Sequence, residues 1–133
     1  MKLAAVGSNC IDYYNNLDGG KAFPGGGPVN MAVYTVRLGG EAAYIGPVGN
    51  DSYGEIMMEA MKKKGVNISH LRVEEGKTAV SQVELVDGER ILGDYEEGVL
   101  KLTYSVMKIW ILSKILMWSS VTYGARWKDS SRN

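Results

Sequence analysis

The sequence predicts an α/β fold with a mostly parallel sheet, and three observations lead to that prediction. Apolar runs at residues 2–6 and 42–48 are typical of short buried strands. The segments 29–38 and 53–64 carry apolar residues at helical spacing. Strands and helices that alternate at these intervals favour right-handed βαβ units, in which the strands pair in parallel.

Turn and capping residues set the bounds of these elements. Residues 11–17 form a second extended segment. Asn15-Asn16 and Asp18-Gly19-Gly20 are turn formers. The first helix is expected to end at Leu38, because Gly39 comes next. Asp51 suits the N-cap position of the second helix, which Gly65 ends.

A hairpin is predicted over residues 79–95. Residues 79–86 alternate between two faces, Asp87-Gly88 is a two-residue turn that hairpins favour, and the chain then returns. Both strands carry polar groups, so we expect the hairpin to lie over a site or against a partner. An ordinary surface hairpin is the alternative.

Three consecutive glycines, Gly25 to Gly27, lie at the centre of the pattern. Glycine loses the most backbone freedom on folding, so such a run is expected where the backbone must approach another group or adopt a positive φ. Pro28 suits a first helical turn. The loop therefore opens onto a helix N-terminus, whose free N–H groups attract oxygen-rich ligands, and Asn30 adds an amide there.

Composition excludes several classes of function. The 133 residues are one domain's worth or a piece of a larger domain. A net charge of zero argues against a nucleic-acid or membrane-surface partner. The single cysteine, Cys10, rules out an internal disulfide framework. The apolar run after Lys2 is too short for a signal peptide, so we expect a cytoplasmic location.

The composition changes near residue 100. Fourteen of the fifteen acidic residues lie between Asp12 and Glu97, and all three tryptophans come later. The apolar cluster at 106–118 is too short and too charged for a membrane span of about 20 residues. We expect residues 101–133 to be a divergent tail, either a buried amphipathic helix or out-of-frame sequence.

Several blocks together resemble the ribokinase/PfkB family of carbohydrate kinases. The run Gly-Gly-Gly-Pro-Val-Asn-Met-Ala at 25–32, with Gly39 and Gly49 at their spacings, is similar to the family's N-terminal signature. The blocks at 7–12, 48–54 and 65–71 also resemble it. Within the family, 82–85 and 93–99 are most similar to the branch that phosphorylates fructoselysine. A nucleoside kinase stays open, since that branch shares the glycine signature.

The resemblance implies a ribokinase-like three-layer fold, in which residues 1–100 are the sugar-binding part. Asp12 would accept hydrogen bonds from two sugar hydroxyls, Gly25 and Gly26 would let the backbone approach the sugar, and Asn30 would bind a further hydroxyl. Strands near 11–17 and 79–95 would form a β lid that covers the sugar and forms a homodimer. ATP and Mg²⁺ are the implied cofactors.

Each of these residues also has a simpler interpretation. Asp12 alone could be a solvated turn carboxylate, and Asn30 a helix cap or surface amide. Cys10 is best interpreted as a small buried residue beside the site, and His70 as a loop or capping residue. The glycines match neither a P-loop nor a dinucleotide fingerprint, because the required neighbours do not follow.

The family's Gly-Ala-Gly-Asp motif, whose aspartate is the catalytic base, does not occur in the 133 residues. Gly124-Ala125-Arg126 does not match it. We therefore expect a fold truncated on its C-terminal side, with the nucleotide site largely absent and little or no kinase turnover. The alternative class is a non-catalytic sugar-binding or lid-dimerisation fragment. Translating the coding DNA past codon 100 in its other two frames would test the frameshift hypothesis.

Overall fold

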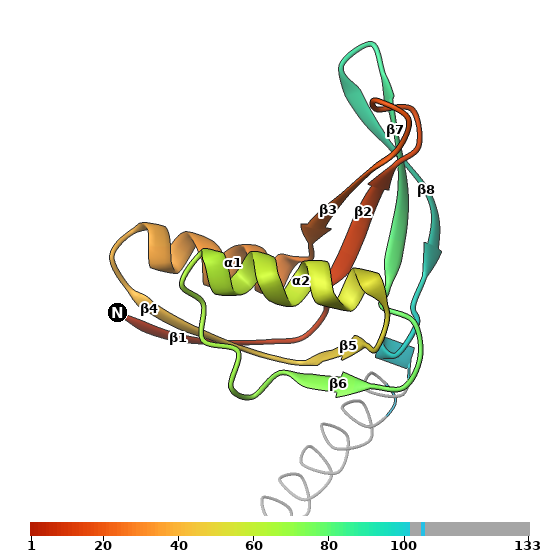
Figure 1. The fold of residues 1–133 in the computed structure, drawn as a ribbon. Coiled ribbons are helices and arrows are strands. Elements are labelled where there is room, and N and C mark those ends of the chain that lie inside the picture. Colours follow the sequence, from red (N-terminus) through yellow and green to blue (C-terminus); the bar gives the residue numbers. More distant parts are fainter. Residues whose placement is uncertain (102–104, 106–133) are drawn as a thin grey trace, which may run out of the picture. The chain divides into compact units, whose positions relative to one another are not determined.

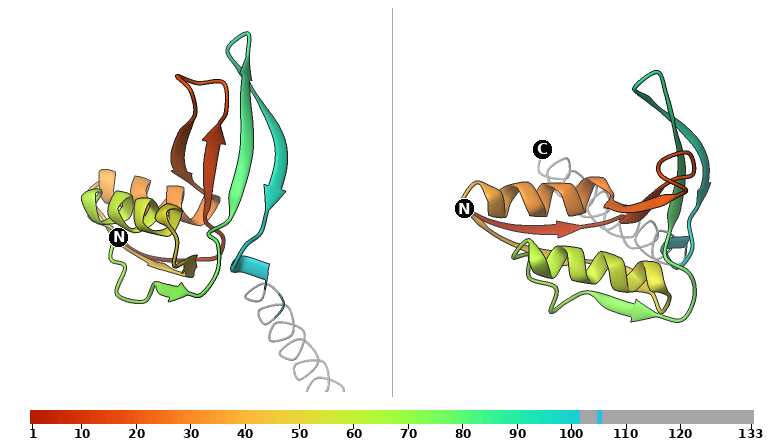
Figure 2. Two further views of the ribbon diagram at one scale, coloured as in Figure 1. Left: turned by 45° about the vertical axis from the view of Figure 1, so that its right-hand side comes forward. Right: turned by 45° about the horizontal axis from the view of Figure 1, so that its top comes forward.

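The computed structural model describes residues 1–101 and 105, and the account below concerns those residues. Two helices lie on one face of short parallel strand pairs, and a four-stranded sheet projects from one end of this layer (Figure 1). We call the helices with their parallel strands the body, and the projecting sheet the lid. Both views in Figure 2 show the two helices on the same face of the body strands.

The body consists of two parallel strand pairs and two helices. Strand β1 (Lys2–Val6) pairs with β4 (Glu41–Ile45), and β5 (Pro47–Gly49) pairs with β6 (Arg72–Glu74). Helix α1 (Gly27–Arg37) contacts β1 and β4, and α2 (Ser52–Lys63) contacts β5. The parallel pairing expected from the alternation of strands and helices is confirmed. The core is formed by buried apolar residues from both helices and from the strands, among them Ala5, Ile11, Val29, Val33, Tyr44, Val48, Met57 and Met61.

Local signals place both helices as expected. Pro28 lies in the first turn of α1, and Leu38 caps its C-terminus before Gly39, whose φ is +85°. The Asp51 side chain caps α2 by accepting a hydrogen bond from the Gly54 N–H at 3.0 Å. Gly65 follows α2 with a φ of +78°, which glycine adopts without strain.

The lid has the strand order β3-β2-β7-β8, formed by β2 (Cys10–Tyr14), β3 (Lys21–Gly25), β7 (Val80–Val86) and β8 (Glu89–Glu96). The hairpin prediction is confirmed, with the Asp87-Gly88 turn between β7 and β8. The sequence analysis did not anticipate β3, nor β6 in the body. Strand β3 tolerates Pro24 because it lies at the edge of the sheet.

The two faces of the lid are distinct. In the parallel pair of β2 and β7, Asp12 lies beside Ser81 and Tyr14 beside Val83. We call this side of the sheet the Asp12 face. The other side, which alternates with it, carries Ile11 and Gln82 and is called the opposite face. A β-bulge lies in the β7–β8 pair between Ser81 and Val83, where the simple alternation predicted from the sequence is interrupted.

The expectations about the tail at 101–133 and the cluster at 106–118 fall almost entirely outside the described residues. In the part of the chain that the structure describes, no helix is long and apolar enough to cross a membrane.

Candidate functional site

The carboxylate of Asp12 lies against Gly25 at the base of the lid. Pairing of β2 with β3 sets Cys10 opposite Gly25 and Asp12 opposite Phe23. A Cβ atom on Gly25 would lie 2.8 Å from Asp12 Oδ2, which is closer than real Cβ contacts. Glycine at this position therefore leaves room for the carboxylate, and Asp12 itself is only partly buried.

The next residue, Gly26, makes the turn into α1. Its φ is +107°, and a Cβ atom there would lie 2.8 Å from Asn9 Cα and 2.9 Å from the Ser8 carbonyl oxygen. Both the dihedral angle and the close approach require glycine. The expectation that the glycines allow close backbone contact is confirmed here for the loop between β1 and β2. Approach to a sugar stays a prediction.

Asn30 lies one turn into α1, and its backbone N–H donates to the Gly26 carbonyl oxygen at 3.0 Å. Its side chain is exposed. The structure thus brings Asp12, Gly25 and Gly26 together and places Asn30 one helical turn beyond the Gly26 turn.

Asn9 holds this region to the body, and the sequence analysis gave it no role. Its Nδ2 donates to Tyr44 Oη and to the Pro47 carbonyl oxygen, both at 2.7 Å. Tyr44 Oη in turn donates to the Gly7 carbonyl oxygen at 2.7 Å. Asn9 is 1% exposed, and its Oδ1 is buried without a hydrogen-bond partner among the described residues. The sequence signal that could have indicated Asn9 is its position two residues after Gly7, the glycine that ends the first strand.

Cys10 lies beside Asp12, as expected, but it is half-buried and not fully buried. Its Sγ is 3.5 Å from Asp12 Oδ1, so the thiol donates a weak hydrogen bond to the carboxylate. Burial, the charge of Asp12 and this hydrogen bond together raise the pKa of the Cys10 thiol to about 12. The thiol is therefore protonated near neutral pH and poorly suited to act as a nucleophile.

Farther along the Asp12 face, Tyr14 connects to two other strands. Its ring meets Phe23 edge-on, with 5.6 Å between the ring centroids. Its Oη accepts a hydrogen bond from Arg90 Nη1 at 3.4 Å. This hydrogen bond, the interaction with Tyr14 and the charge of Asp12 raise the pKa of Arg90 above its usual value.

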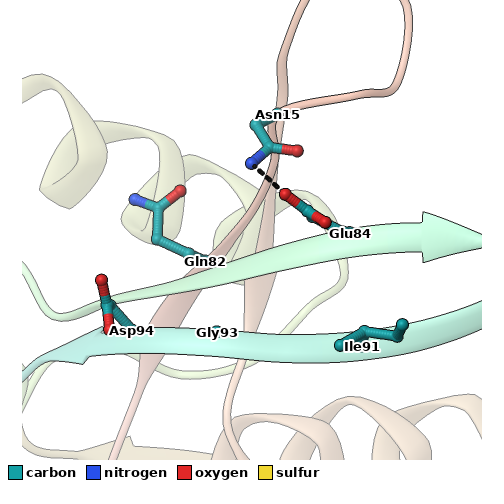
Figure 3. A pocket seen from close by; sticks show the side chains of 6 residues that line it. All are labelled: Asn15, Gln82, Glu84, Ile91, Gly93 and Asp94. Carbon is teal, nitrogen blue, oxygen red and sulfur yellow. Dashed lines mark hydrogen bonds between the residues drawn. The ribbon is translucent and has the colours of Figure 1, made fainter.

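The lid also contains an open cavity of about 350 Å³, and it lies on the opposite face (Figure 3). Asn15 and Glu84 both line it and are joined by a hydrogen bond of 3.2 Å. Gln82 lines this cavity, whereas its neighbours Ser81 and Val83 belong to the Asp12 face. The cavity is therefore separate from the carboxylate of Asp12. The remaining lining residues are Ile91, Gly93 and Asp94.

Asp51, from the block at 48–54, joins the body to the lid. Its Oδ1 accepts from the Gly54 N–H and from Thr78 Oγ1, and its Oδ2 accepts from the Thr78 N–H. Burial alone would raise the pKa of Asp51, but the hydrogen bonds from Thr78 and Gly54 outweigh burial and hold the pKa below its usual value. Thr78 lies just before β7, so this carboxylate fixes the base of the hairpin.

The described residues do not fit a resident metal ion. Among them, no group of three or more His, Cys, Asp or Glu side chains is placed to hold a cation. Asp12 contacts Cys10 and Gly25, whereas Asp51 binds Thr78 and Gly54, so the two carboxylates do not form a common cation site. We therefore assign no step to Mg²⁺ on this part of the chain.

An α/β body with a projecting β lid is the arrangement of a ribokinase-like fold. The structure is similar to a fructokinase from Xylella fastidiosa (TM-score 0.61, 27% identity), over 71% of this chain and 31% of that one. It is also similar to a fructokinase from Vibrio cholerae (TM-score 0.64, 30% identity), over 71% of this chain and 33% of that one. The predicted α/β ribokinase-like fold is confirmed.

The chain belongs to the pfkB family of carbohydrate kinases, whose model matches residues 2–116. It is 47% identical over 98 residues to the fructoselysine 6-kinase of Escherichia coli, covering 74% of this chain and 37% of that protein. It is 41% identical over 99 residues to a fructosamine kinase of Bacillus subtilis, covering 74% of this chain and 34% of that protein. The chain thus spans little more than a third of the length of these relatives. The divergence of residues 101–133 from the family stays a prediction.

Proposed function

We propose that this chain forms the sugar-binding part of a PfkB-type kinase that phosphorylates a hydroxyl of fructoselysine or a related sugar derivative. The observation that carries the proposal is the environment of Asp12, whose carboxylate receives one weak thiol hydrogen bond and is partly exposed at the base of the lid. A carboxylate has about four acceptor positions, so most of them remain for ligand hydroxyls. The names of the relatives support the choice of sugar.

The proposed roles follow from the placement of each residue. Asp12 accepts hydrogen bonds from two sugar hydroxyls, and such charge-assisted bonds are about twice as strong as neutral ones. Gly25 leaves room for the carboxylate and, with Gly26, lets the backbone approach the sugar, and Asn30 offers its exposed amide to a further hydroxyl. A fructokinase from Xylella fastidiosa is described with bound ATP, and ATP with Mg²⁺ is the cofactor set that we propose for the whole enzyme.

Turnover needs a base and positioned charge for the phosphates. Because the 133 residues contain no Gly-Ala-Gly-Asp motif, we propose that this chain binds the sugar without phosphorylating it. A second candidate is a lid-dimerisation module, favoured by β8, which is an edge strand exposed along its whole length. Sedimentation of the purified chain at increasing concentration would reveal a homodimer. We also propose a cytoplasmic location for the enzyme.

Titration calorimetry on the 133-residue chain tests the sugar site with fructoselysine, fructose and adenosine. We expect Asp12→Asn to weaken fructoselysine binding about a hundredfold, since two charge-assisted hydrogen bonds lose their charge. Asp87→Asn is the matched control: Asp87 is exposed in the hairpin turn at a φ of +51°, a conformation that asparagine tolerates. Equal binding by wild type and Asp12→Asn, or preference for adenosine, would contradict the proposal. ATP-dependent phosphorylation above background would contradict the absence of a base.

A further inference from the structure

Arg90 lies on the Asp12 face of the lid, beyond Tyr14 as seen from Asp12. In the β7–β8 pair it stands opposite Leu85, which shares the side of β7 that carries Val83. Its guanidinium reaches back to Tyr14 Oη at 3.4 Å. Asp12 and Tyr14 are two residues apart on β2, or about 7 Å along the strand. A cationic group and an acceptor carboxylate therefore share one face at a short separation.

The charge of Arg90 is not neutralised by the described part of the chain. The described ion pairs join Lys2 to Glu41, Lys21 to Asp18 and Arg72 to Glu74, and none includes Arg90. Its hydrogen-bond partner is the phenol oxygen of Tyr14, and the other guanidinium N–H groups have no acceptor among the described residues. Arginine presents five donors in a planar fork that matches carboxylate geometry.

The surface between the two charged groups is apolar. The buried ring of Tyr14, 8% exposed, packs there against Phe23, which is 45% exposed. Leu92 stands opposite Val83 and is 72% exposed. Such a surface suits a flexible hydrocarbon segment, such as the four-carbon stem of lysine.

We propose that Arg90 determines specificity by binding the α-carboxylate of an amino acid attached to the sugar. The substrate class is then a fructosamine with a free amino-acid carboxylate, and a free hexose is a poorer ligand. This inference rests on the proposed function, because it takes the sugar to lie at Asp12. The lysine stem crosses the exposed apolar side chains of Phe23 and Leu92 and carries the carboxylate to Arg90.

Calorimetry with four ligands tests the assignment: fructoselysine, the fructosamine of butylamine, fructose and fructose 6-phosphate. The butylamine compound keeps the hydrocarbon stem and lacks the carboxylate. We expect Arg90→Gln to weaken fructoselysine binding about tenfold and to leave binding of the butylamine compound unchanged. Arg90→Lys keeps the charge and should recover part of the loss. Arg37→Gln removes an exposed arginine of α1 that stacks over Tyr34, and it should match wild type for every ligand.

The outcomes separate the two proposals. If Arg90→Gln binds fructoselysine as wild type does while Asp12→Asn loses it, the carboxylate assignment is wrong and the sugar site stands. An equal loss for both amine derivatives would give Arg90 a structural role only. Preferential binding of fructose 6-phosphate that Arg90→Gln abolishes would assign the guanidinium to a phosphate. No binding of any ligand by wild type would overturn both proposals.

Discussion

Two aspartates at the junction of lid and body have opposite surroundings. Asp51 receives three hydrogen bonds at 2.6 to 3.0 Å, from Thr78 Oγ1, the Thr78 N–H and the Gly54 N–H. From the described residues Asp12 receives one, donated by the Cys10 thiol at 3.5 Å. Both carboxylates belong to blocks that resemble the family, so sequence resemblance alone gives them similar weight.

The difference distinguishes a structural carboxylate from one available to a ligand. The acceptor capacity of Asp51 is used within the protein, where it caps α2 and anchors the start of β7. Asp12 is held in position by the β2 ladder and by contact with Gly25, yet most of its acceptor positions receive no hydrogen bond from the part of the chain that the structure describes. A carboxylate that is fixed but not satisfied is suited to bind a polyol.

The largest expected difference between Asp12 and Asp51 is in the free energy of unfolding when each is replaced by alanine. Asp51→Ala should lower the free energy of unfolding by about 2 kcal/mol, because α2 loses its N-cap and the Thr78 donors lose their acceptor. Asp12→Ala should change it by less than about 0.5 kcal/mol, as surface substitutions usually do. Urea denaturation followed by circular dichroism measures both. Asp94→Ala, on the exposed strand β8, is the control.

A similar loss of stability in Asp12→Ala and Asp51→Ala would mean that the two carboxylates have the same structural role. The sugar-binding proposal would then lose the observation that carries it.

Lowering the pH should reduce the stability that Asp51 provides, with a smaller effect than the alanine substitution. Because the pKa of Asp51 is lowered in the folded protein, its stabilising contribution is complete above its usual value of about 3.9. That contribution is lost as the pH falls through the lower folded-state pKa. Urea midpoints at pH 7, 4 and 3 should therefore fall less steeply for Asp51→Asn than for wild type. Parallel pH profiles for the two proteins would contradict the assignment.

Local sequence signals were enough to predict the helices and the hairpin. Asp51 and Gly65 mark the ends of α2 through contacts within a few residues, and Asp87-Gly88 sets the turn of the lid hairpin. Strand β3 was missed because its sequence, with Pro24 and a terminal glycine, has weak strand propensity. It forms because β2 offers a partner and because Pro24 is tolerated at the sheet edge.

The parts of the site that sequence did not reveal depend on contacts between distant residues. Asn9 and Tyr44 are 35 residues apart, and Tyr14 and Arg90 are 76 residues apart. No local period or spacing encodes either pair. The family resemblance implied a site shared by Asp12, Gly25 and Gly26; Asp12 lies against Gly25, whereas Gly26 closely approaches Ser8 and Asn9. Their role toward a sugar, with that of Asn30, stays a prediction.

The smallest expected effect concerns the thiol that contacts only one of the two aspartates. Burial is the main cause of the raised pKa of Cys10, and Asp12 adds to it through its charge and hydrogen bond. Asp12→Asn should therefore lower this pKa modestly and speed alkylation by iodoacetamide at pH 8 a few-fold, since the thiolate is the reactive form. Asp51→Asn, which touches no thiol, should leave the rate unchanged, and unfolding in urea should speed it in every variant. Equal rates for folded wild type and folded Asp12→Asn would show that Asp12 does not act on the thiol, and its carboxylate would then be farther from Cys10 than 3.5 Å.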